Sequence, residues 1–288
     1  MLLEMMELAP SALCEPPETF VPGEISSDGF HEGLDWISGT GDKVIFTRVA
    51  PDFSTSEIYF AAKKAAGWRS EKLPFSNGGY DAGVVFSKDM KRLILTSTRE
   101  SDVAPEGNWN IWSVSVSTEG AGWRFGEAAF LNAPVNTDKN ECCAVFGKGG
   151  EIFFSSDRNG PWSLYRALPA ANGYIVEKLE GRINTDDGAW PSAYIEESDT
   201  LLFSSIRKSG AGGDDIYAST RVDGRWTEAR MLGGPVNKSG YEDGARVFDG
   251  TFYWSSRPVQ RAAEDPMIPS DIFYMSAVCA AEGSFSLE

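Results

Sequence analysis

Acidic side chains recur at one position of a repeated pattern in this sequence. Each of five segments opens with a small-residue turn and carries a carboxylate close to an apolar run: Glu32, Asp81, Glu141, Asp187 and Glu242. Several carboxylates that converge on one point can bind a hard cation such as Ca²⁺. A pair of them can act as general acid and base, or as a nucleophile, on a glycoside. The structural alternative is that each carboxylate caps a turn or pairs with an arginine of its own segment.

Arginine recurs at a second position, near the end of an apolar run. The five copies are separated by 51, 59, 49 and 50 residues: Arg48, Arg99, Arg158, Arg207 and Arg257. A residue that occurs once per repeat at one position favours an architectural role. We expect charge-assisted bonds to a loop carbonyl or to the polar residues before the next apolar run, Glu57, Asn110, Asp215 and Asp271. If these guanidinium groups faced a channel instead, they would select an anionic ligand.

The elements that would position these residues are short strands. The stretches 44–60, 93–112, 150–165, 201–217 and 252–273 share one order: an apolar run, an arginine, a loop and a second apolar run. Another run precedes each of them, and an aromatic residue that predicts a fourth strand follows: Trp68, Trp123, Tyr174, Trp226 and Phe285. Four strands in about 50 residues, repeated, are typical of a β-propeller. One blade cannot bury both of its faces, so the blades must pack on one another.

The last repeat is incomplete. Only three residues follow Phe285, while residues 17–27 resemble the segments that precede the later repeats. We therefore predict an all-β, five-bladed β-propeller of four-stranded blades, with the ring closed by an N-terminal strand that removes the free sheet edge. The prediction leaves residues 1–16 unassigned and places one domain at 17–288, with units at about 17–76, 77–136, 137–184, 185–237 and 238–288. The alternative is six blades, with a degenerate blade in residues 1–30.

The repeats resemble those of a known group of propellers. FSSDR at 154–158, GGDDIY at 212–217 and GGPVN at 233–237 are similar to the WD40-like repeats of the TolB type, and especially to bacterial single-domain proteins made of such repeats. The resemblance covers about residues 17–279 and implies a β-propeller. It does not imply one activity, since members serve as periplasmic interaction modules or as accessory domains of peptidases. Members commonly have an acid before each first strand, and Gly188-Ala189 departs from this pattern.

Composition excludes some classes of partner. With 26 basic and 42 acidic residues the formal charge is −16, which argues against nucleic acid and anionic membranes as partners. No apolar run reaches the ~18 residues of a membrane span. The N-terminus contains Glu4 and Glu7 and no basic residue, so it is a poor signal peptide. We expect a monomer that is cytoplasmic as written, or periplasmic if an export signal was removed.

The cysteines do not follow the spacing of a metal site. They are Cys14, Cys142, Cys143 and Cys279. Adjacent residues of a strand point to opposite faces, and we predict buried free thiols. His31 is the single histidine, which argues against a His/Cys zinc site and requires any Ser-His-Asp triad to use it.

Three long loops, 99–109, 207–214 and 257–270, should lie on the same face as the acids and are suited to recognition. We also expect Trp36 and Trp190 to lie near this face, although a core position is typical of tryptophan. The leading prediction is a non-catalytic binding propeller that recognises a protein segment, peptide or glycan at an acid-lined channel mouth. Its predicted ligand-binding residues are Glu32, Asp81, Glu141, Asp187, Glu242, Trp109 and Arg261.

No cofactor is required by this prediction, and calcium, held by Glu32, Asp81, Glu141 and Glu242, is a candidate ligand. The alternative is a carbohydrate-active hydrolase that uses two of these same four acids as acid and base. Their equivalent positions weigh against it, because catalytic acids need environments that separate their pKa values. A third interpretation, an accessory domain of a protease, requires a catalytic partner.

Overall fold

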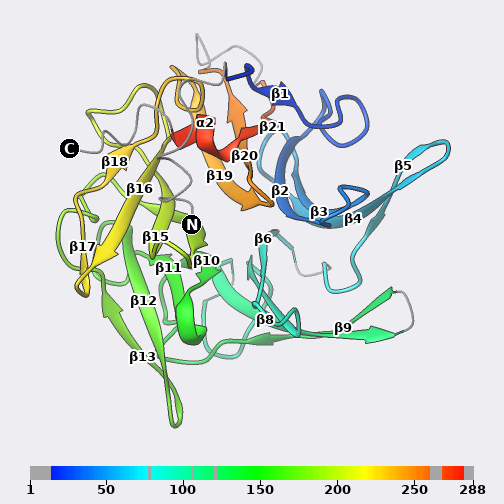
Figure 1. The fold of residues 1–288 in the computed structure, drawn as a ribbon. Helices are drawn as coiled ribbons and strands as arrows, with labels where there is room; N and C mark the ends of the chain where they lie inside the picture. The colour runs from blue at the N-terminus through cyan, green and yellow to red at the C-terminus, as the bar shows by residue number, and fades with distance from the viewer. Residues whose placement is uncertain (1–13, 77–78, 106, 120–121, 260–267, 282–288) are drawn as a thin grey trace.

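Five antiparallel sheets surround a central axis in the computed structural model (Figure 1). The structure describes residues 14–76, 79–105, 107–119, 122–259 and 268–281. The predicted five-bladed β-propeller of four-stranded blades is confirmed, and the six-blade alternative is wrong. No helix in these described ranges is long and apolar enough to cross a membrane.

Each blade consists of consecutive strands, ordered from the centre outwards. The first blade contains β2 (His31–Ile37), β3 (Lys43–Val49), β4 (Ser56–Lys64) and β5 (Gly67–Lys72). The second contains β6 (Asp81–Phe86), β7 (Arg92–Ser97), β8 (Asn110–Glu119) and β9 (Gly122–Phe130). The third contains β10 (Glu141–Phe146), β11 (Ile152–Ser156), β12 (Ser163–Ala170) and β13 (Gly173–Lys178), with a 3-10 turn η1 (Lys148–Gly150).

The last two blades vary this plan. The fourth contains β14 (Trp190–Ile195), β15 (Thr200–Ser205) and β16 (Asp215–Val222), and two short strands, β17 (Arg225–Trp226) and β18 (Arg230–Met231), share its outer edge. The fifth contains β19 (Tyr241–Phe248), β20 (Thr251–Arg257), β21 (Asp271–Ser276) and β1 (Glu18–Thr19), and α2 (Ala277–Ala281) follows β21.

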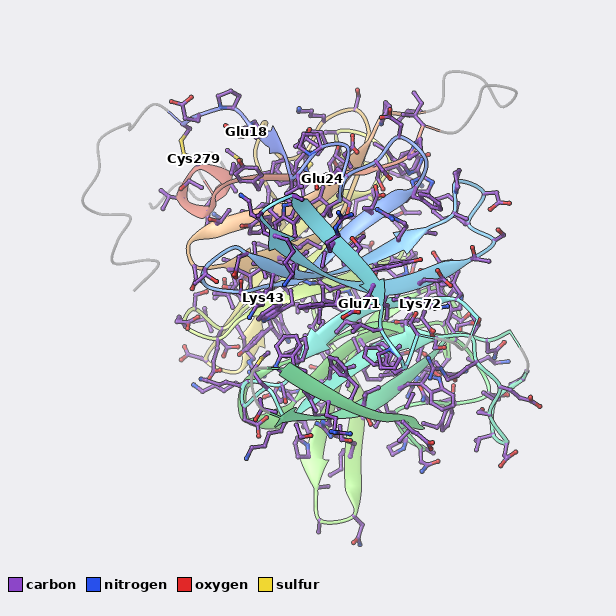
Figure 2. The ribbon with its side chains drawn as sticks, turned by 90° about the vertical axis from the view of Figure 1, so that its right-hand side faces the viewer. Glu18, Glu24, Lys43, Glu71, Lys72 and Cys279 are labelled. Carbon is purple, nitrogen blue, oxygen red and sulfur yellow. A yellow bond between two sulfur atoms is a disulfide. The ribbon has the colours of Figure 1, made fainter. Side chains whose placement is uncertain are left out.

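The ring is closed by both ends of the described chain. β1 pairs with β21, with Glu18 opposite Tyr274 and Thr19 opposite Phe273, which confirms the predicted N-terminal strand. Cys14 and Cys279 form a disulfide beside this pairing, and Figure 2 shows Glu18 and Cys279 on the same side of the molecule. The free-thiol prediction is therefore wrong for these two cysteines, and Cys142 and Cys143 are free. The outer strand expected at Phe285 lies outside the described residues.

The core lies between the blades. The second strands carry the largest fully buried side chains, among them Phe46, Phe153, Phe154 and Phe203. Apolar residues fill both faces of these strands because each face meets another blade.

All five inner strands have an irregularity in their pairing with the second strand, and three of them share the same bulge. Pairing with the second strand shifts between Ala82 and Val85 in β6, between Cys142 and Val145 in β10 and between Asp243 and Arg246 in β19. The first residue of each bulge has a positive φ, 68° at Gly83, 58° at Cys143 and 61° at Gly244. A bulge re-aims side chains at the rim of a sheet, and here it changes which residues of the inner strands face the central axis.

Candidate functional site

Strand register identifies equivalent positions in the blades. Asp81, Glu141 and Glu242 each lie opposite a serine of the second strand, at Ser97, Ser156 and Ser256, and Glu32 lies opposite Arg48. In the fourth blade Trp190 lies opposite Ser204, so Ala189 occupies the acid position. Asp187 is two residues earlier and half-buried, and it is not the register equivalent of the other four acids.

The four acids that are equivalent are buried and engaged within their own blades. Glu141 accepts hydrogen bonds from Ser156 Oγ and Thr137 Oγ1, both at 2.8 Å, and pairs with Arg158 at 3.1 Å. In the same way Glu32 pairs with Arg48 at 3.2 Å and Asp81 with Arg99 at 2.7 Å. Glu242 accepts bonds from Ser256 Oγ at 3.0 Å and from the backbone N–H of Lys238. Burial raises the pKa of Glu32 to about 7.

The repeated arginines also contact the connection between blades. Arg99 donates to the carbonyl of Phe75 at 3.0 Å, Arg48 to Ile25 at 3.2 Å and Arg207 to Ile183 at 2.6 Å. Arg158 donates to the carbonyls of Pro134 and Val135. Arg257 instead lies over the ring of Tyr241, 3.8 Å from its centroid.

The expected bonds to loop carbonyls are present for Arg48, Arg99, Arg158 and Arg207. Side-chain hydrogen bonds and ion pairs with the polar residues before the third strand, Glu57, Asn110, Asp215 and Asp271, are not found among the described residues, although Arg48 lies opposite Glu57 in the strand register. Buried oxygens of Asn110 and Asp215 have no hydrogen-bond partner there. The reason is position: the guanidinium groups of Arg48, Arg99 and Arg158 lie beside the first-strand acid and the incoming linker, both of which provide acceptors.

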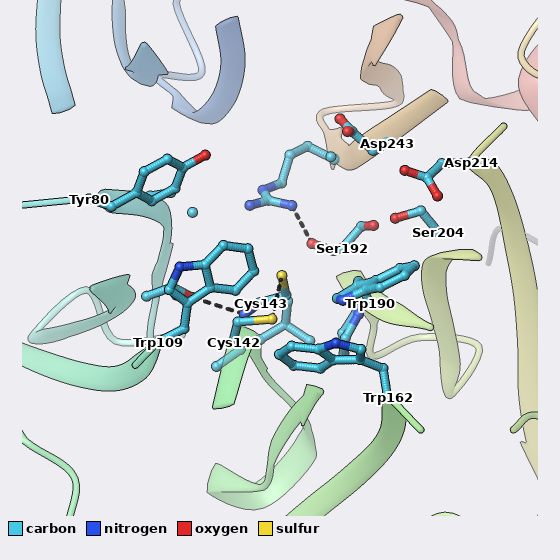
Figure 3. A pocket seen from close by; sticks show the side chains of 18 residues that line it. Tyr80, Trp109, Cys142, Cys143, Trp162, Trp190, Ser192, Ser204, Asp214 and Asp243 are labelled. Atoms are coloured by element: carbon cyan, nitrogen blue, oxygen red, sulfur yellow. Dashed lines mark hydrogen bonds between the residues drawn. The ribbon is translucent and has the colours of Figure 1, made fainter. Parts of the chain in front are cut away.

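A cavity of about 490 Å³ opens at the centre of the ring (Figure 3). The position directly after the acid on the inner strand faces this cavity and differs in every blade. It is Ala82, Cys142, Trp190 and Asp243 in the second to fifth blades, all of which line the cavity, and Gly33 in the first.

The residue before the third strand forms a second set around the cavity. Trp109, Trp162 and Asp214 hold this position in the second, third and fourth blades, and all three line the cavity. The carbonyls of Trp109 and Asp214 each accept a 2.8 Å bond from the next blade's acid, at the backbone N–H of Glu141 and Glu242. These bonds place each residue beside the variable inner-strand position of the following blade.

Glycine permits the close approach that positions Asp214. The N–H of Gly213 donates to the carbonyl of Gly240 at 2.6 Å, and a Cβ at Gly213 would overlap the ring of Tyr241. The loop at 207–214 therefore packs directly on the start of β19. This contact explains why Asp214 and Asp243, which belong to different blades, lie close together (Figure 3).

Four aromatic rings form one wall of the cavity. Tyr80 stacks on Trp109 with centroids 5.9 Å apart and an interplanar angle of 20°. Trp109 and Trp162 are 6.1 Å apart, and Trp162 and Trp190 are 6.3 Å apart. All four rings are half-buried, so each keeps surface for a ligand.

Two carboxylates, of Asp214 and Asp243, and the guanidinium of Arg246 are the charged groups that line the cavity. Burial deep in the ring and the neighbouring Asp214 raise the pKa of Asp243 to about 7, although its side chain is open to the cavity. Burial also raises the pKa of Asp214. Arg246 donates to the carbonyls of Ser192 and Ala245 and lies 3.6 Å from Asp35. Its buried Nε has no hydrogen-bond partner in the described structure.

The residues predicted from the sequence divide into three groups. Trp109 lines the cavity, as does Trp190, whereas Trp36 packs in the core against Phe86 and Trp123. Arg261 lies outside the described residues. The acids Glu32, Asp81, Glu141, Asp187 and Glu242 are not among the cavity-lining residues, and their role in ligand binding stays a prediction. Calcium stays a prediction too, and within the described ranges no group of three or more His, Cys, Asp or Glu residues is arranged to hold a metal.

No protein-family model matches the sequence, and no curated protein is similar to it in sequence. The structure is similar to the catalytic domain of the GH62 α-L-arabinofuranosidase of Coprinopsis cinerea, with a TM-score of 0.52 and 11% identity over 91% of this chain and 97% of that one. It is also similar to 1,3Gal43A, an exo-β-1,3-galactanase from Clostridium thermocellum, with a TM-score of 0.51 and 10% identity over 90% and 62% of the two chains.

A puromycin hydrolase matches with a TM-score of 0.44 and 12% identity, and the match covers 94% of this chain but 43% of the hydrolase. The present chain thus spans less than half of that protein. At these identities the similarities concern the fold.

Proposed function

We propose that the protein binds a carbohydrate in the central cavity of its propeller. The observation that carries this proposal is the opposition of a wall of aromatic rings to two open carboxylates within one cavity. The flat, apolar faces of tryptophan suit the C–H faces of sugar rings, and carboxylates accept hydrogen bonds from hydroxyl groups. A volume of about 490 Å³ falls in the range of small-molecule sites.

Two further observations support this proposal. First, the cavity-lining residues are not repeated from blade to blade: one register position holds an alanine, a cysteine, a tryptophan and an aspartate in four blades. Variation at one position of an otherwise repeated scaffold is expected where recognition takes place. Second, two similar structures with TM-scores above 0.5 are named for activity on arabinosides and galactans. From the repeat motifs we also infer kinship with TolB-type propellers.

A second candidate function is glycoside hydrolysis, which Asp243 and Asp214 favour. Unlike the repeated acids, these two come from non-equivalent positions and have different neighbours. A carboxyl with a pKa of about 7 can remain protonated near neutral pH and act as a general acid. Asp214 would then serve as the base or nucleophile. This pair replaces the pairs first considered among Glu32, Asp81, Glu141 and Glu242.

The test uses calorimetry with arabino- and galacto-oligosaccharides, followed by chromatography of the same mixtures. We expect one site per chain, and Trp162→Ala should weaken binding about tenfold, equivalent to about 1.4 kcal/mol. Trp68→Ala is the matched control, because Trp68 is half-buried on β5 and outside the cavity. Equal losses in both variants would contradict the site.

Hydrolysis is decided by the same samples. Release of shorter sugars that stops in Asp243→Asn, while binding persists, would support the hydrolase. If the wild type binds a glycan and releases no product, the binding function is supported and hydrolysis is contradicted. Absence of binding to every glycan class tested would contradict both functions.

A further inference from the structure

Cys142 and Cys143 lie in the wall of the cavity with their sulfur atoms 3.2 Å apart (Figure 3). Strand alternation predicts that adjacent side chains point to opposite faces, and here that prediction is wrong. The bulge in β10 starts at Cys143, whose positive φ of 58° turns its side chain towards that of Cys142. The two thiols therefore form a pair.

The backbone at Cys143 has a positive φ, and at the equivalent position of the second and fifth blades this conformation is adopted by glycine. Gly83 and Gly244 hold the equivalent position and have φ values of 68° and 61°. The N–H of Cys143 donates to Thr96 Oγ1 at 2.9 Å, and the N–H of Gly83 makes the same bond to Thr47. A non-glycine residue in this region is strained, and such strain concentrates at functional sites. A cysteine is placed here at an energetic cost that the other blades avoid.

We propose that Cys142 and Cys143 form a reversible dithiol–disulfide site whose reaction partners are small-molecule disulfides. A disulfide bond is about 2.05 Å long, so the sulfur atoms need to approach by only about 1.1 Å. Adjacent Cα atoms lie about 3.8 Å apart, less than the minimum of about 4.4 Å in ordinary disulfides. The bond would thus be strained and easily reduced, as labile disulfides are.

The order of attack follows from exposure. Cys143 is partly open to the cavity, whereas Cys142 is fully buried and burial raises the pKa of its thiol. The thiolate of Cys143 attacks one sulfur of the small disulfide, which forms a mixed disulfide and releases one thiolate. That thiolate takes the proton of Cys142, whose sulfur then attacks Cys143 Sγ and displaces the second thiolate, which takes up the proton that Cys143 released when it ionised. Two protein thiols and one disulfide become one protein disulfide and two small thiols.

This chemistry does not depend on what the cavity binds. The pair lies beside Trp109 and Trp162, which line the same cavity. Oxidation would remove two weak S–H donors and leave an apolar bridge next to the aromatic wall. The described chain already contains one disulfide, between Cys14 and Cys279, so an oxidising compartment, where disulfides persist, is its expected environment.

The experiment treats mildly reduced full-length protein with glutathione disulfide, stops the reaction with acid and maps the peptides by mass. The peptide that contains both residues should lose two hydrogens and retain no glutathione. Cys142→Ser should retain one glutathione on Cys143, because no second thiol can displace it. Cys143→Ser should stay unmodified, because the remaining thiol is buried.

Cys143→Gly gives β10 the residue of the equivalent bulges and is therefore the control for folding. It should fold with an intact Cys14–Cys279 disulfide and form no second one. A persistent glutathione adduct on the wild type would overturn the proposal. The proposal would also be overturned if both thiols of the wild type stayed unreacted while Cys142→Ser was modified. Lack of reaction in every folded variant would also overturn it, because it would show that Cys143 is inaccessible.

Discussion

At the scale of residues, Asp243 differs from the acids that recur in each blade. Glu141 has hydroxyl, backbone and guanidinium partners. No hydrogen bond or ion pair of the Asp243 carboxylate occurs within the described ranges, and Asp214 lies nearby. A carboxylate that is open to the cavity and has no hydrogen-bond partner in the described structure is suited to accept a hydrogen bond from a ligand or to carry a proton.

This environment predicts a pH dependence of stability. The unfolded pKa of aspartate is about 3.9, and that of Asp243 is raised to about 7. Between these values the folded state binds more protons than the unfolded state, so its contribution to stability falls as pH rises. Asp243→Asn removes that loss. The free energy of unfolding of Asp243→Asn minus that of the wild type should therefore rise from pH 4 to pH 7 and then level off. Urea titrations at each pH measure this difference.

Asp52→Asn is the control of opposite sign. Hydrogen bonds from Ser54 lower the pKa of the exposed Asp52, so its stabilising contribution is present above the unfolded pKa and is lost as pH falls. A difference curve for Asp243→Asn that is flat, or that slopes like the one for Asp52→Asn, would show that Asp243 ionises normally.

At the scale of elements, an ion pair between acid and arginine connects the linker to the inner strand in the first three blades. Glu141 is fully buried and Arg158 nearly so. Removal of one partner leaves the other charge buried without compensation, which costs about 3–5 kcal/mol. We expect Glu141→Ala to lower the free energy of unfolding by about 3 kcal/mol, with cavity affinity unchanged. Chemical denaturation and calorimetry on the same samples measure both quantities.

Glu177→Ala is the matched control for this pair, because Glu177 and Arg166 form an exposed pair on the outer strands. Its loss should cost less than about 1 kcal/mol. If Glu141→Ala abolished ligand binding and left stability intact, Glu141 would be a ligand-binding residue, as the sequence first suggested.

The same elements explain which features could be predicted from the sequence. A repeat makes shared positions visible, and these positions fold the blades: the apolar strands, the acids and the arginines. The cavity is formed by positions that the repeats do not share, so Trp162, Asp243 and Arg246 had no pattern to reveal them. Variation directly after each repeated acid was the available signal. The bulge at Cys143 and the contact of Gly213 with Tyr241 depend on packing between blades, which periodicity does not encode.

At the scale of the whole molecule, a propeller is only as stable as the closure of its ring. Here β1 supplies two paired residues, Glu18 and Thr19, and Phe20 packs edge-on against Tyr253 and Tyr274. This is a small contact for a seam that joins the two ends of the fold. The Cys14–Cys279 disulfide connects residues 265 positions apart beside the seam and restricts the unfolded chain over almost its whole length.

Loss of this disulfide should therefore open the ring at the fifth blade first. We expect Cys279→Ser to lower the free energy of unfolding by about 2–5 kcal/mol, the usual effect of removing a native disulfide. Hydrogen exchange should rise earliest in β1 and β21, while β7 and β11, whose blades do not neighbour the fifth blade, stay protected. Cys143→Gly, which removes a cysteine but no disulfide, should show neither change. Uniform exchange in every blade of Cys279→Ser would mean that β1 alone holds the ring closed.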